Sequence, residues 1–281
     1  MARFPTVTRL LVGFNSGDVL AYSAVSPDVL PTLLVDNGSI DDCVAKARAL
    51  GYDVLELGAN RGYGGAIMAG LRALASEFVL IANPDVSMTP EDVARLLAAA
   101  DRYPDADLFA PALERPDGRA FFRRASRLEK AGGPREAPSG DACICVVSGA
   151  ALLARRAAFI AHGGFDPAIF LYFEDDDLGL RYRREKRAIV YVPEARARHL
   201  GNASSLETPG LQTLKDVSFG WSWAHVQGKH GIGNRWLTLA RIAATLVLMT
   251  LSLRVKQARR RAGVLRGYWL CLRGRRAPYL P

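Results

Sequence analysis

Four consecutive acids, Glu174 to Asp177, are the residues of this sequence best suited to do chemistry. They follow directly on an apolar segment, residues 169–173. Adjacent carboxylates repel one another, so a folded chain tolerates them only beside cations, a metal ion, a helix N-terminus or open water. Such a group could supply a general base. The structural alternative is the solvated, acid-rich start of a helix, which is the commoner role of a charged run.

The residues after these acids have the spacing of a helix. Asp177 and Arg181 are four positions apart, so one helix turn could join them in an ion pair. Leu178 and Tyr182 have the same spacing and could form an apolar pair. Basic residues then gather over residues 183–187, where the helix dipole favours them. We therefore expect the acids to lie at a helix N-terminus.

The first 90 residues alternate between strand and helix patterns. Strands are predicted at residues 6–14, 30–35, 53–57 and 78–82, and helices at 41–50, at 66–76 and from Thr89 onward. This alternation predicts right-handed βαβ units, that is, an α/β fold with a mostly parallel sheet flanked by helices. Ligands of such sheets bind beyond the carboxyl ends of the strands. Asn15, Asp36, residues 60–65 and Asp85 all lie at such ends, which predicts one shared cleft.

The middle of the chain carries weaker patterns. Residues 104–140 are rich in Pro, Gly and Arg and are expected to form loops, with an edge strand at 120–123. Strands are also predicted at residues 142–147 and 189–192, and helical spacing returns at 211–229. We expect two regions, a sheet domain over residues 1–210 and a helical region over 211–281.

The helical region holds the chain's positive charge. The net charge of the 281 residues is +9, yet residues 217–281 contain twelve Lys/Arg and no Asp/Glu, which leaves −3 for the rest. The apolar run 242–253 is too short to cross a membrane, which takes about 20 residues. Aromatic and apolar residues interleaved with arginines suit a helix lying on an anionic membrane surface. The alternative is packing against the sheet domain or in a homo-oligomer interface. No nucleic-acid partner is expected.

Composition places the chain among ordinary globular proteins, with 49% hydrophobic and 23% charged residues. The four cysteines show neither paired metal spacing nor a disulfide framework, which favours a reducing cytoplasm. The first ten residues lack the long apolar core of a secretion signal. We therefore expect a protein at the inner face of the cytoplasmic membrane, bound peripherally.

Two further motifs could serve a phosphorylated ligand. The loop GANRGYGGA (residues 58–66) precedes a helix, so its backbone N–H groups could receive phosphates. It matches neither a dinucleotide fingerprint nor a P-loop, and tight packing explains its glycines equally well. Asp85 ends a strand as Asn83-Pro84-Asp85, either as a turn former or as a ligand for magnesium or manganese. His199 would gain a role beyond structure only if it met the same metal.

Six segments, taken in order, resemble the family 2 glycosyltransferases, and most of all their rhamnosyltransferase-like branch with the GT-A fold. They are LLVDNGS (33–39), NRGYGGA (60–66), ANPDV (82–86), SGAALLARRAAF (148–159), GGFDPAIFLYFEDDDLGLR (163–181) and YVPEARARH (191–199), with Ser204 and Ser205 after the last. Together they span about residues 6–205. Single segments are weak signals, but their order and separations are specific.

The resemblance assigns roles to named residues. The nucleotide-binding residues would be Phe14, Asn15, Asp36, Asn60, Arg61, Gly62, Gly64 and Asn83, with Asp36 reading the base or ribose. Asp85 and His199 would hold Mg²⁺ or Mn²⁺ against the diphosphate. Asp175 would be the general base, with Glu174 and Asp177 shaping the acceptor site. One carboxylate at Asp85, where many relatives have two, and an acid at 176, where an apolar residue is common, depart from the pattern and leave the base assignment open among the neighbouring acids.

The function so implied is inverting sugar transfer from a nucleotide donor to a hydroxyl group. The resemblance favours dTDP-rhamnose as donor, with a UDP-sugar as the alternative. It also implies as acceptor a lipid-linked saccharide of a bacterial surface polysaccharide. A metal-dependent nucleotidyltransferase would use a similar sheet and metal, but usually needs a lysine near the glycine loop, where only Arg61 stands. A polyanion-binding protein would explain the basic helical region and leave the acids without a purpose.

Overall fold

The computed structural model describes residues 4, 6–23, 25, 28–118, 120–123, 125–129, 136–201 and 210–279. Ser204 and Ser205 lie outside these residues. One ten-stranded sheet forms the centre of the molecule, in the order β3-β2-β1-β4-β9-β6-β10-β5. Its first part is parallel: β3 (Asp53–Glu56), β2 (Thr32–Asp36), β1 (Val7–Gly13) and β4 (Phe78–Ala82). The crossovers contain η1 (Leu20–Ser23), α1 (Cys43–Ala49) and α2 (Tyr63–Ala73). This part confirms the predicted βαβ units.

The second part of the sheet is mixed. β9 (Ala151–Arg155) lies antiparallel between β4 and β6 (Leu108–Glu114), and β10 (Ile189–His199) runs parallel to β6. The short strands β5 (Val86–Ser87), β7 (Ala120–Phe121) and β8 (Ala142–Cys143) pair antiparallel at the margins. Four of the described strand pairs are therefore parallel and five antiparallel, which adds a mixed half to the expected parallel sheet.

The prediction that residues 104–140 form only loops and an edge strand was wrong. Residues 108–113 are buried in β6, which is an inner strand of the sheet. Pro111 hid this strand, because proline cannot donate a ladder hydrogen bond and normally marks an edge or a bulge. The sheet accommodates it at an irregularity: Pro111 pairs with Val192, and the register of β10 shifts between Val192 and Arg196. The strand predicted at 142–147 is also shorter than expected, since only Ala142–Cys143 pair.

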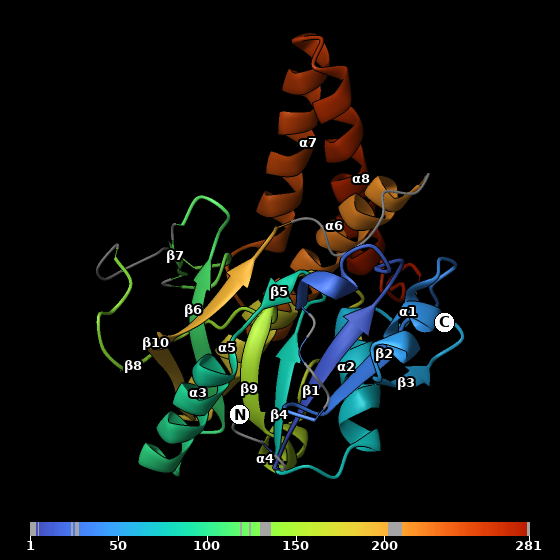
Figure 1. Cartoon of the computed structure of the whole chain (residues 1–281). Helices are drawn as coiled ribbons and strands as arrows, with labels where there is room; N and C mark the ends of the chain where they lie inside the picture. Colours follow the sequence, from blue (N-terminus) through green and yellow to red (C-terminus); the bar gives the residue numbers. More distant parts are fainter. Residues whose placement is uncertain are drawn as a thin grey trace.

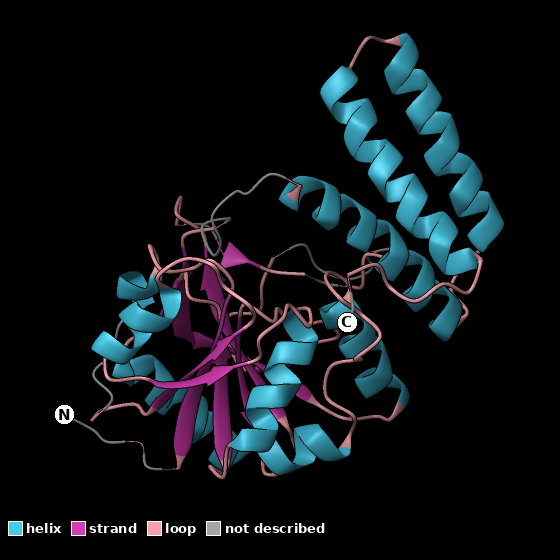
Figure 2. Cartoon of the chain, turned by 90° about the vertical axis from the view of Figure 1, so that its right-hand side faces the viewer, coloured by secondary structure: helices cyan, strands magenta, loops and turns pink. Residues whose placement is uncertain are grey.

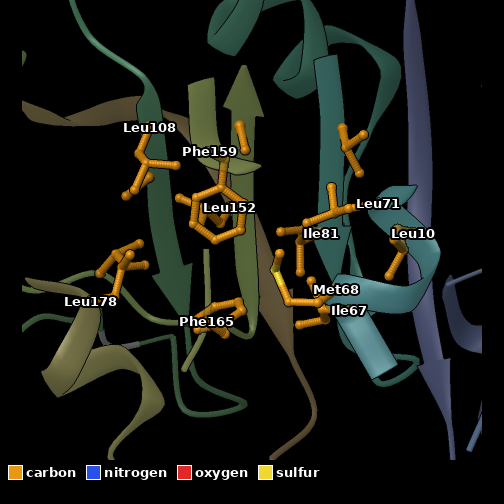
Figure 3. Packing of buried hydrophobic residues seen from close by; sticks show 14 of the residues in the cluster. Leu10, Ile67, Met68, Leu71, Ile81, Leu108, Leu152, Phe159, Phe165 and Leu178 are labelled. Atoms are coloured by element: carbon orange, nitrogen blue, oxygen red, sulfur yellow. The ribbon is translucent and has the colours of Figure 1, made fainter. Parts of the chain in front are cut away.

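Helices cover both faces of the sheet (Figure 1). Alternate residues of β4 show the division: Val79 and Ile81 pack with α2, α4 (Arg156–Ala161) and α5 (Glu174–Arg184). Phe78 and Leu80 pack with α3 (Pro90–Arg102), which the Thr89–Asp92 capping box begins. Figure 3 shows the first cluster, in which Met68 of α2 lies beside Phe165 and beside Phe159 of α4. The core thus fixes α5, and with it the acid run, against the sheet.

Three helices complete the chain: α6 (Leu211–His230), α7 (Arg235–Leu251) and α8 (Val255–Leu272). Figure 2 shows α7 and α8 projecting from the sheet domain as an antiparallel hairpin, with α6 running past its base. α8 crosses α6 closely, because a Cβ atom at Gly220 or Gly267 would overlap the carbonyl oxygen of Val264 or Val217. None of the described helices has both the length and the hydropathy needed to span a membrane. The division at residue 210 stays a prediction.

Candidate active site

A cleft of about 380 Å³ opens at the carboxyl ends of the parallel strands. The loops after β1, β2 and β4 supply one side of it. The N-terminus of α5 and the first turns of α6 supply the other. Its lining residues include Phe14, Asn37, Asn60, Gly62, Tyr63, Asn83, Arg127, Gly149, Tyr172, Glu174, Asp175, His199, Leu214 and Lys215. The predicted shared cleft therefore has a physical counterpart, and it contains seven of the thirteen residues to which the sequence assigned a site role.

Helix geometry separates the four acids. All four lie in the first turn of α5, where successive side chains point about 100° apart. Glu174 and Asp175 face the cleft. Asp176 is buried, where it accepts a hydrogen bond from the N–H of Arg127 (2.7 Å) and pairs with the Arg123 guanidinium. Their charges therefore act in different places.

Asp177, the fourth acid, points away from the cleft. It is fully buried, and its Oδ2 accepts from Arg181 Nε (2.9 Å), the ion pair predicted from their spacing. Lys229 Nζ and His230 Nε2 of α6 each lie 2.8 Å from its Oδ1. The position of Asp177 therefore suits helix docking, and its predicted part in the acceptor site has no support from this placement.

Asp175 is held by backbone. The N–H of Gly149, in the turn before β9, donates to Asp175 Oδ1 over 2.9 Å. The Tyr63 hydroxyl in turn donates to the carbonyl oxygen of Gly149 (2.6 Å). A Cβ atom on residue 149 would stand 2.8 Å from that carboxylate oxygen, so this position suits only glycine. The arrangement fixes one oxygen of Asp175, a residue that lines the cleft.

Burial changes the acidity of both cleft carboxyls. It raises the pKa of Glu174 above the usual range, and the charge of Asp175 raises it further. Burial also raises the pKa of Asp175, but the Gly149 N–H and the charge of Arg123 oppose that shift. At neutral pH the pair therefore divides into a protonated Glu174 and an ionised Asp175. Oε2 of Glu174 is buried without a hydrogen-bond partner among the described residues, which fits a group awaiting a ligand.

The backbone before α5 is strained. Tyr172 and Phe173 both have positive φ, 66° and 65°, a region that costs an L-residue roughly 1–2 kcal/mol. Packing holds them there: the rings of both lie against Phe219 of α6, with centroids 5.7 and 5.0 Å away. This conformation turns Tyr172 into the cleft at the point where the acid helix begins. Strain of this kind is common at functional sites.

Two amide side chains build the opposite wall. Asn37 donates to Asn60 Oδ1 (3.0 Å), and its own Oδ1 accepts from the N–H of Arg61 (2.8 Å). Asn60 Oδ1 also accepts from the N–H of Gly62 (2.9 Å). Gly62 precedes α2 with φ 76°, and a Cβ atom there would overlap the carbonyl oxygen of Phe170. The glycine loop thus approaches the acid segment as closely as backbone allows.

Asp85 and His199 meet through strand pairing. β5 follows Asp85 directly and pairs with the end of β10, with His199 opposite Val86. This brings His199 Nε2 within 3.3 Å of Asp85 Oδ2. One carboxylate and one imidazole fit a divalent cation that takes its remaining ligands from water and a substrate diphosphate. No group of three or more His, Cys, Asp or Glu side chains suited to a metal occurs in the described ranges.

The remaining predicted residues lie near the cleft without lining it. Asp36 is buried, and its carboxylate accepts from the N–H of Ser39 (3.2 Å), while Asn15 Oδ1 accepts from the N–H of Ile40 (2.8 Å). Both therefore shape loops. Gly64 allows close packing, since its Cβ would stand 2.9 Å from that of Phe165. Arg61 is exposed outside the cleft, with its side chain on Leu57 O (3.3 Å).

Sequence reasoning missed several lining residues. Asn37 directly follows the predicted Asp36, so the strand-end rule that selected Asp36 also pointed to its neighbour. Tyr63 and Gly149 act through backbone contacts that only the fold creates. Arg127 comes from a stretch expected to be loop, and Lys215 from the region expected to be separate from the sheet domain. Arg127 and Lys215 bring positive charge to the cleft that His199 also lines.

A buried ionic network ties α6 to the acid helix. Lys229 Nζ bridges Asp166 Oδ2 (2.7 Å) and Asp177 Oδ1 (2.8 Å). Burial alone would raise the pKa of Asp166, but hydrogen bonds from His225 and Lys229 bring it below its usual range. The pKa of Asp177 is lowered against burial in the same way, by Lys229 and His230. α6 of the C-terminal region therefore helps to hold α5 in place.

Comparison with known proteins identifies sequence relatives. A family model described as Glycosyl transferase family 2 matches residues 23–163, half of the chain. An N-acetylglucosaminyl-diphospho-decaprenol L-rhamnosyltransferase from Mycobacterium tuberculosis (strain ATCC 25618 / H37Rv) is 36% identical over an alignment of 201 positions, which covers 59% of this chain. The match spans 65% of that relative's length, slightly less than two thirds.

Solved structures with the same fold are more distant in sequence. The mannosyltransferase PcManGT from Pyrobaculum calidifontis, in complex with GDP-Man and Mn²⁺, has a TM-score of 0.57 at 14% identity and covers 97% of this chain and 88% of its own. GalNAc-T7 with UDP, GalNAc and Mn²⁺ has a TM-score of 0.56 at 12% identity, covering 81% and 55%. At these identities the likeness concerns the fold alone, and both structures are of the expected GT-A type.

We predict that Lys229→Met destabilises the folded protein by on the order of 1–2 kcal/mol at pH 7, because it removes a partly exposed cation shared by two largely buried carboxylates, which keep their other partners. Asp166 and Asp177 have depressed folded pKa values, so their contribution is present above the unfolded pKa of about 3.9 and is lost as pH falls through the folded pKa. The deficit should therefore shrink below about pH 4. Urea unfolding at both pH values measures it.

Lys46→Met is the matched control, since Lys46 pairs with Asp18 and Asp42 on the exposed surface. It should cost less than about 1 kcal/mol. Equal costs for the two variants would show that the Asp166–Lys229–Asp177 network does not anchor α5.

Proposed function

The chain belongs to glycosyl transferase family 2, and on that premise we propose that it transfers a sugar from a nucleoside diphosphate donor to a hydroxyl group of a lipid-linked saccharide. One observation carries the proposal: Asp175 lines the same cleft as Gly62 of the glycine loop and as His199, whose Nε2 lies 3.3 Å from Asp85 Oδ2. A base, a phosphate-receiving loop and a cation site are the three parts that such a transfer needs.

Asp175 would act as the general base. The acceptor hydroxyl oxygen attacks the anomeric carbon of the donor sugar and forms the new glycosidic bond. The bond from that carbon to the diphosphate oxygen breaks, and the nucleoside diphosphate leaves with the electron pair. The hydroxyl proton passes to the free oxygen of Asp175, while Gly149 keeps the other oxygen in place. A single displacement inverts the anomeric centre and needs no protein nucleophile.

Asp85 and His199 would hold Mg²⁺ or Mn²⁺. When bound, such an ion neutralises negative charge on the departing diphosphate. Gly62 and Tyr63, at the start of α2, line the cleft, so the positive end of the helix dipole can share that task. Arg127 and Lys215 bring further positive charge to the cleft.

Glu174 would serve in its protonated form. Its pKa is raised by burial and by Asp175, so at neutral pH its carboxyl group can both donate and accept a hydrogen bond. Oε2 has no partner within the described part of the chain, and it lies where an acceptor hydroxyl would approach Asp175. Orientation of the acceptor is the role that this environment supports.

The relative from Mycobacterium tuberculosis supports a rhamnosyl donor and a diphospho-polyprenol acceptor. We propose dTDP-rhamnose as the donor on this ground, with a UDP-sugar as the alternative. A nucleotidyltransferase has less support, because Arg61, the one basic residue of the glycine loop, lies outside the cleft. The acceptor's lipid also calls for contact with a membrane surface.

The α7–α8 hairpin is proposed to supply that contact. Along α7 and the following turn, apolar side chains face outward: Leu248 is 63% exposed, Leu251 75% and Leu253 84%. No acid accompanies the twelve Lys/Arg of residues 217–281, so the region complements an anionic surface. Peripheral attachment of this kind agrees with the projecting position of the hairpin in Figure 2.

We predict that Asp175→Asn lowers kcat/KM by at least about 100-fold, because asparagine keeps the hydrogen bond from Gly149 but cannot take a proton. Glu174→Gln should lose far less at neutral pH, since a protonated glutamic acid and glutamine make similar hydrogen bonds. In the wild type, activity should rise as pH increases and Asp175 loses its proton. Because the pKa of Asp175 is raised, this rise should occur at a pH above about 3.9, the pKa of an ordinary aspartate.

Steady-state kinetics of both variants, with calorimetric binding of the nucleoside diphosphate, check this prediction. Nucleotide affinity should survive in Asp175→Asn. A larger loss in Glu174→Gln than in Asp175→Asn would reverse the two roles, and full activity of Asp175→Asn would remove the base assignment.

We also predict that Leu248→Ser combined with Leu251→Ser weakens binding to phosphatidylglycerol vesicles at least about tenfold, because two side chains lose their burial in the membrane interface. Tyr103→Ser, a change at an exposed apolar residue of the sheet domain, is the control and should bind like the wild type. Vesicle flotation measures both. If the wild-type protein does not bind anionic vesicles, the hairpin does not contact the membrane and serves in protein packing instead.

A further inference from the structure

A second hollow lies beside the catalytic cleft, between the first turns of α6 and the N-terminal half of α8. Its volume is about 790 Å³, and we call it the α6–α8 notch. From α6 it is lined by Gln212, Thr213 and Asp216, and from α8 by a row of cations, Lys256, Arg259, Arg260 and Arg266. These positions are separated by three, one and six residues, which at about 100° per residue places all four within about 120° of the helix circumference. The notch is strongly basic.

Most of this charge has no counter-ion. Asp216 accepts from Gln212 Nε2 (2.9 Å) and lies 3.5 Å from Arg260 Nε. It therefore compensates one arginine. Lys256, Arg259 and Arg266 have no carboxylate partner in the ranges that the structure describes. Elsewhere, arginines at the sheet margin do pair, as Arg187 does with Asp107. Three uncompensated cations around one hollow favour an anionic ligand with several oxygens.

The notch has a rigid floor. α6 and α8 approach so closely here that a Cβ atom on Gly263 would stand 2.8 Å from the Cβ of Asp216. Next to it, Val264 and Tyr268 are buried between the helices. The cations therefore project from a fixed helix pair, and a ligand would meet a preformed row of donors.

The first turns of α6 separate the notch from the cleft. Gln212, Thr213 and Asp216 face the notch, while Leu214 and Lys215 face the cleft. The two hollows also act on the same group: Tyr172, in the cleft, has a pKa raised by burial, and the charges of Arg127 and Arg260 oppose that rise. On its far side the notch reaches Val255, where the exposed apolar surface of the hairpin begins.

We propose that the α6–α8 notch binds the phosphate groups of an amphiphilic diphosphate, the lipid-linked acceptor itself. This inference rests on the proposed function and adds a site to it. The order along the molecule matches that of such an acceptor: apolar hairpin, basic notch, then the cleft with Asp175. Guanidinium groups bind phosphate oxygens bidentately, so the notch would fix the acceptor's depth while its saccharide enters the cleft.

The test uses the full chain and farnesyl diphosphate as a soluble probe, in EDTA so that no divalent cation recruits phosphate to the cleft. The notch variant is Arg259→Gln with Arg266→Gln. The matched control is Arg254→Gln with Arg261→Gln, which removes equal charge from the same segment outside the notch lining. By titration calorimetry the notch variant should bind farnesyl diphosphate about tenfold more weakly than the control, as expected for lost charge-assisted hydrogen bonds.

Other probes separate the sources of phosphate. Farnesol should bind weakly and equally to both variants, and inorganic pyrophosphate should bind more weakly than farnesyl diphosphate. Equal weakening of the two variants would assign the effect to diffuse charge and overturn the site. Pyrophosphate binding as tight as that of farnesyl diphosphate would make it a free-phosphate site. If the notch variant and its control differ as strongly in binding to phosphatidylglycerol vesicles, the notch binds membrane headgroups instead of the acceptor.

A kinetic arm keeps this inference distinct from the proposed function. With a lipid-linked acceptor, the notch variant should show a KM raised about tenfold and an unchanged kcat, whereas an acceptor without phosphate should show no change. If the wild type binds farnesyl diphosphate through the notch but transfers no sugar, the proposed function is wrong and the binding site in the notch still stands. If the notch variant transfers sugar with an unchanged KM for the lipid-linked acceptor, the notch does not bind the acceptor's phosphate groups, and the proposed function still stands.

Discussion

The rest of the structure depends on how one helix turn distributes four adjacent negative charges. Carboxylates in sequence would repel one another in any extended segment, but α5 points them in different directions. Asp176 and Asp177 turn into the protein, where cations and N–H groups compensate them. Glu174 and Asp175 are left at the cleft, where burial raises the pKa of Glu174 and the charge of Asp175 raises it further. The start of α5 thus places two carboxyl groups of different acidity side by side.

This arrangement requires support from distant parts of the chain. Phe219 of α6 holds the strained residues before α5, and Lys229 of α6 pairs with Asp177, one of the two inward acids of α5. Gly149, which orients Asp175, lies in the turn before β9, the strand of the mixed half that adjoins β4. The C-terminal helices are consequently part of the active-site framework as well as the basic, exposed end of the molecule. The helix that supports the acid segment, α6, also packs closely against α8 of the hairpin that we propose to contact a membrane.

Local patterns in the sequence predicted what depends on local physics. Strand β4, the helix start at Thr89 and the pair Asp177–Arg181 follow from hydrophobic runs, cap chemistry and helix spacing, and the structure has all three. β6 was missed because Pro111 is normally excluded from inner strands, and only the irregular pairing of β10 permits it. Site residues divide in the same way. Gly62 and Asp175 carry motifs, whereas Tyr63 and Lys215 reach the cleft through long-range packing that no spacing in the sequence encodes.

The central claim is that the cleft binds a nucleoside diphosphate together with a divalent cation held by Asp85 and His199. The most direct measurement is a thermal-shift titration with dTDP, UDP, GDP and ATP, each with and without Mn²⁺, on the wild type and on Asp85→Ala. A ligand at 100 times its Kd stabilises the folded state by about 2.7 kcal/mol. We expect a rise in Tm with dTDP or UDP that requires Mn²⁺ and disappears in Asp85→Ala. A rise in Tm with ATP alone, or one that persists in Asp85→Ala, would show that the cleft does not bind a nucleoside diphosphate through a cation held by Asp85 and His199.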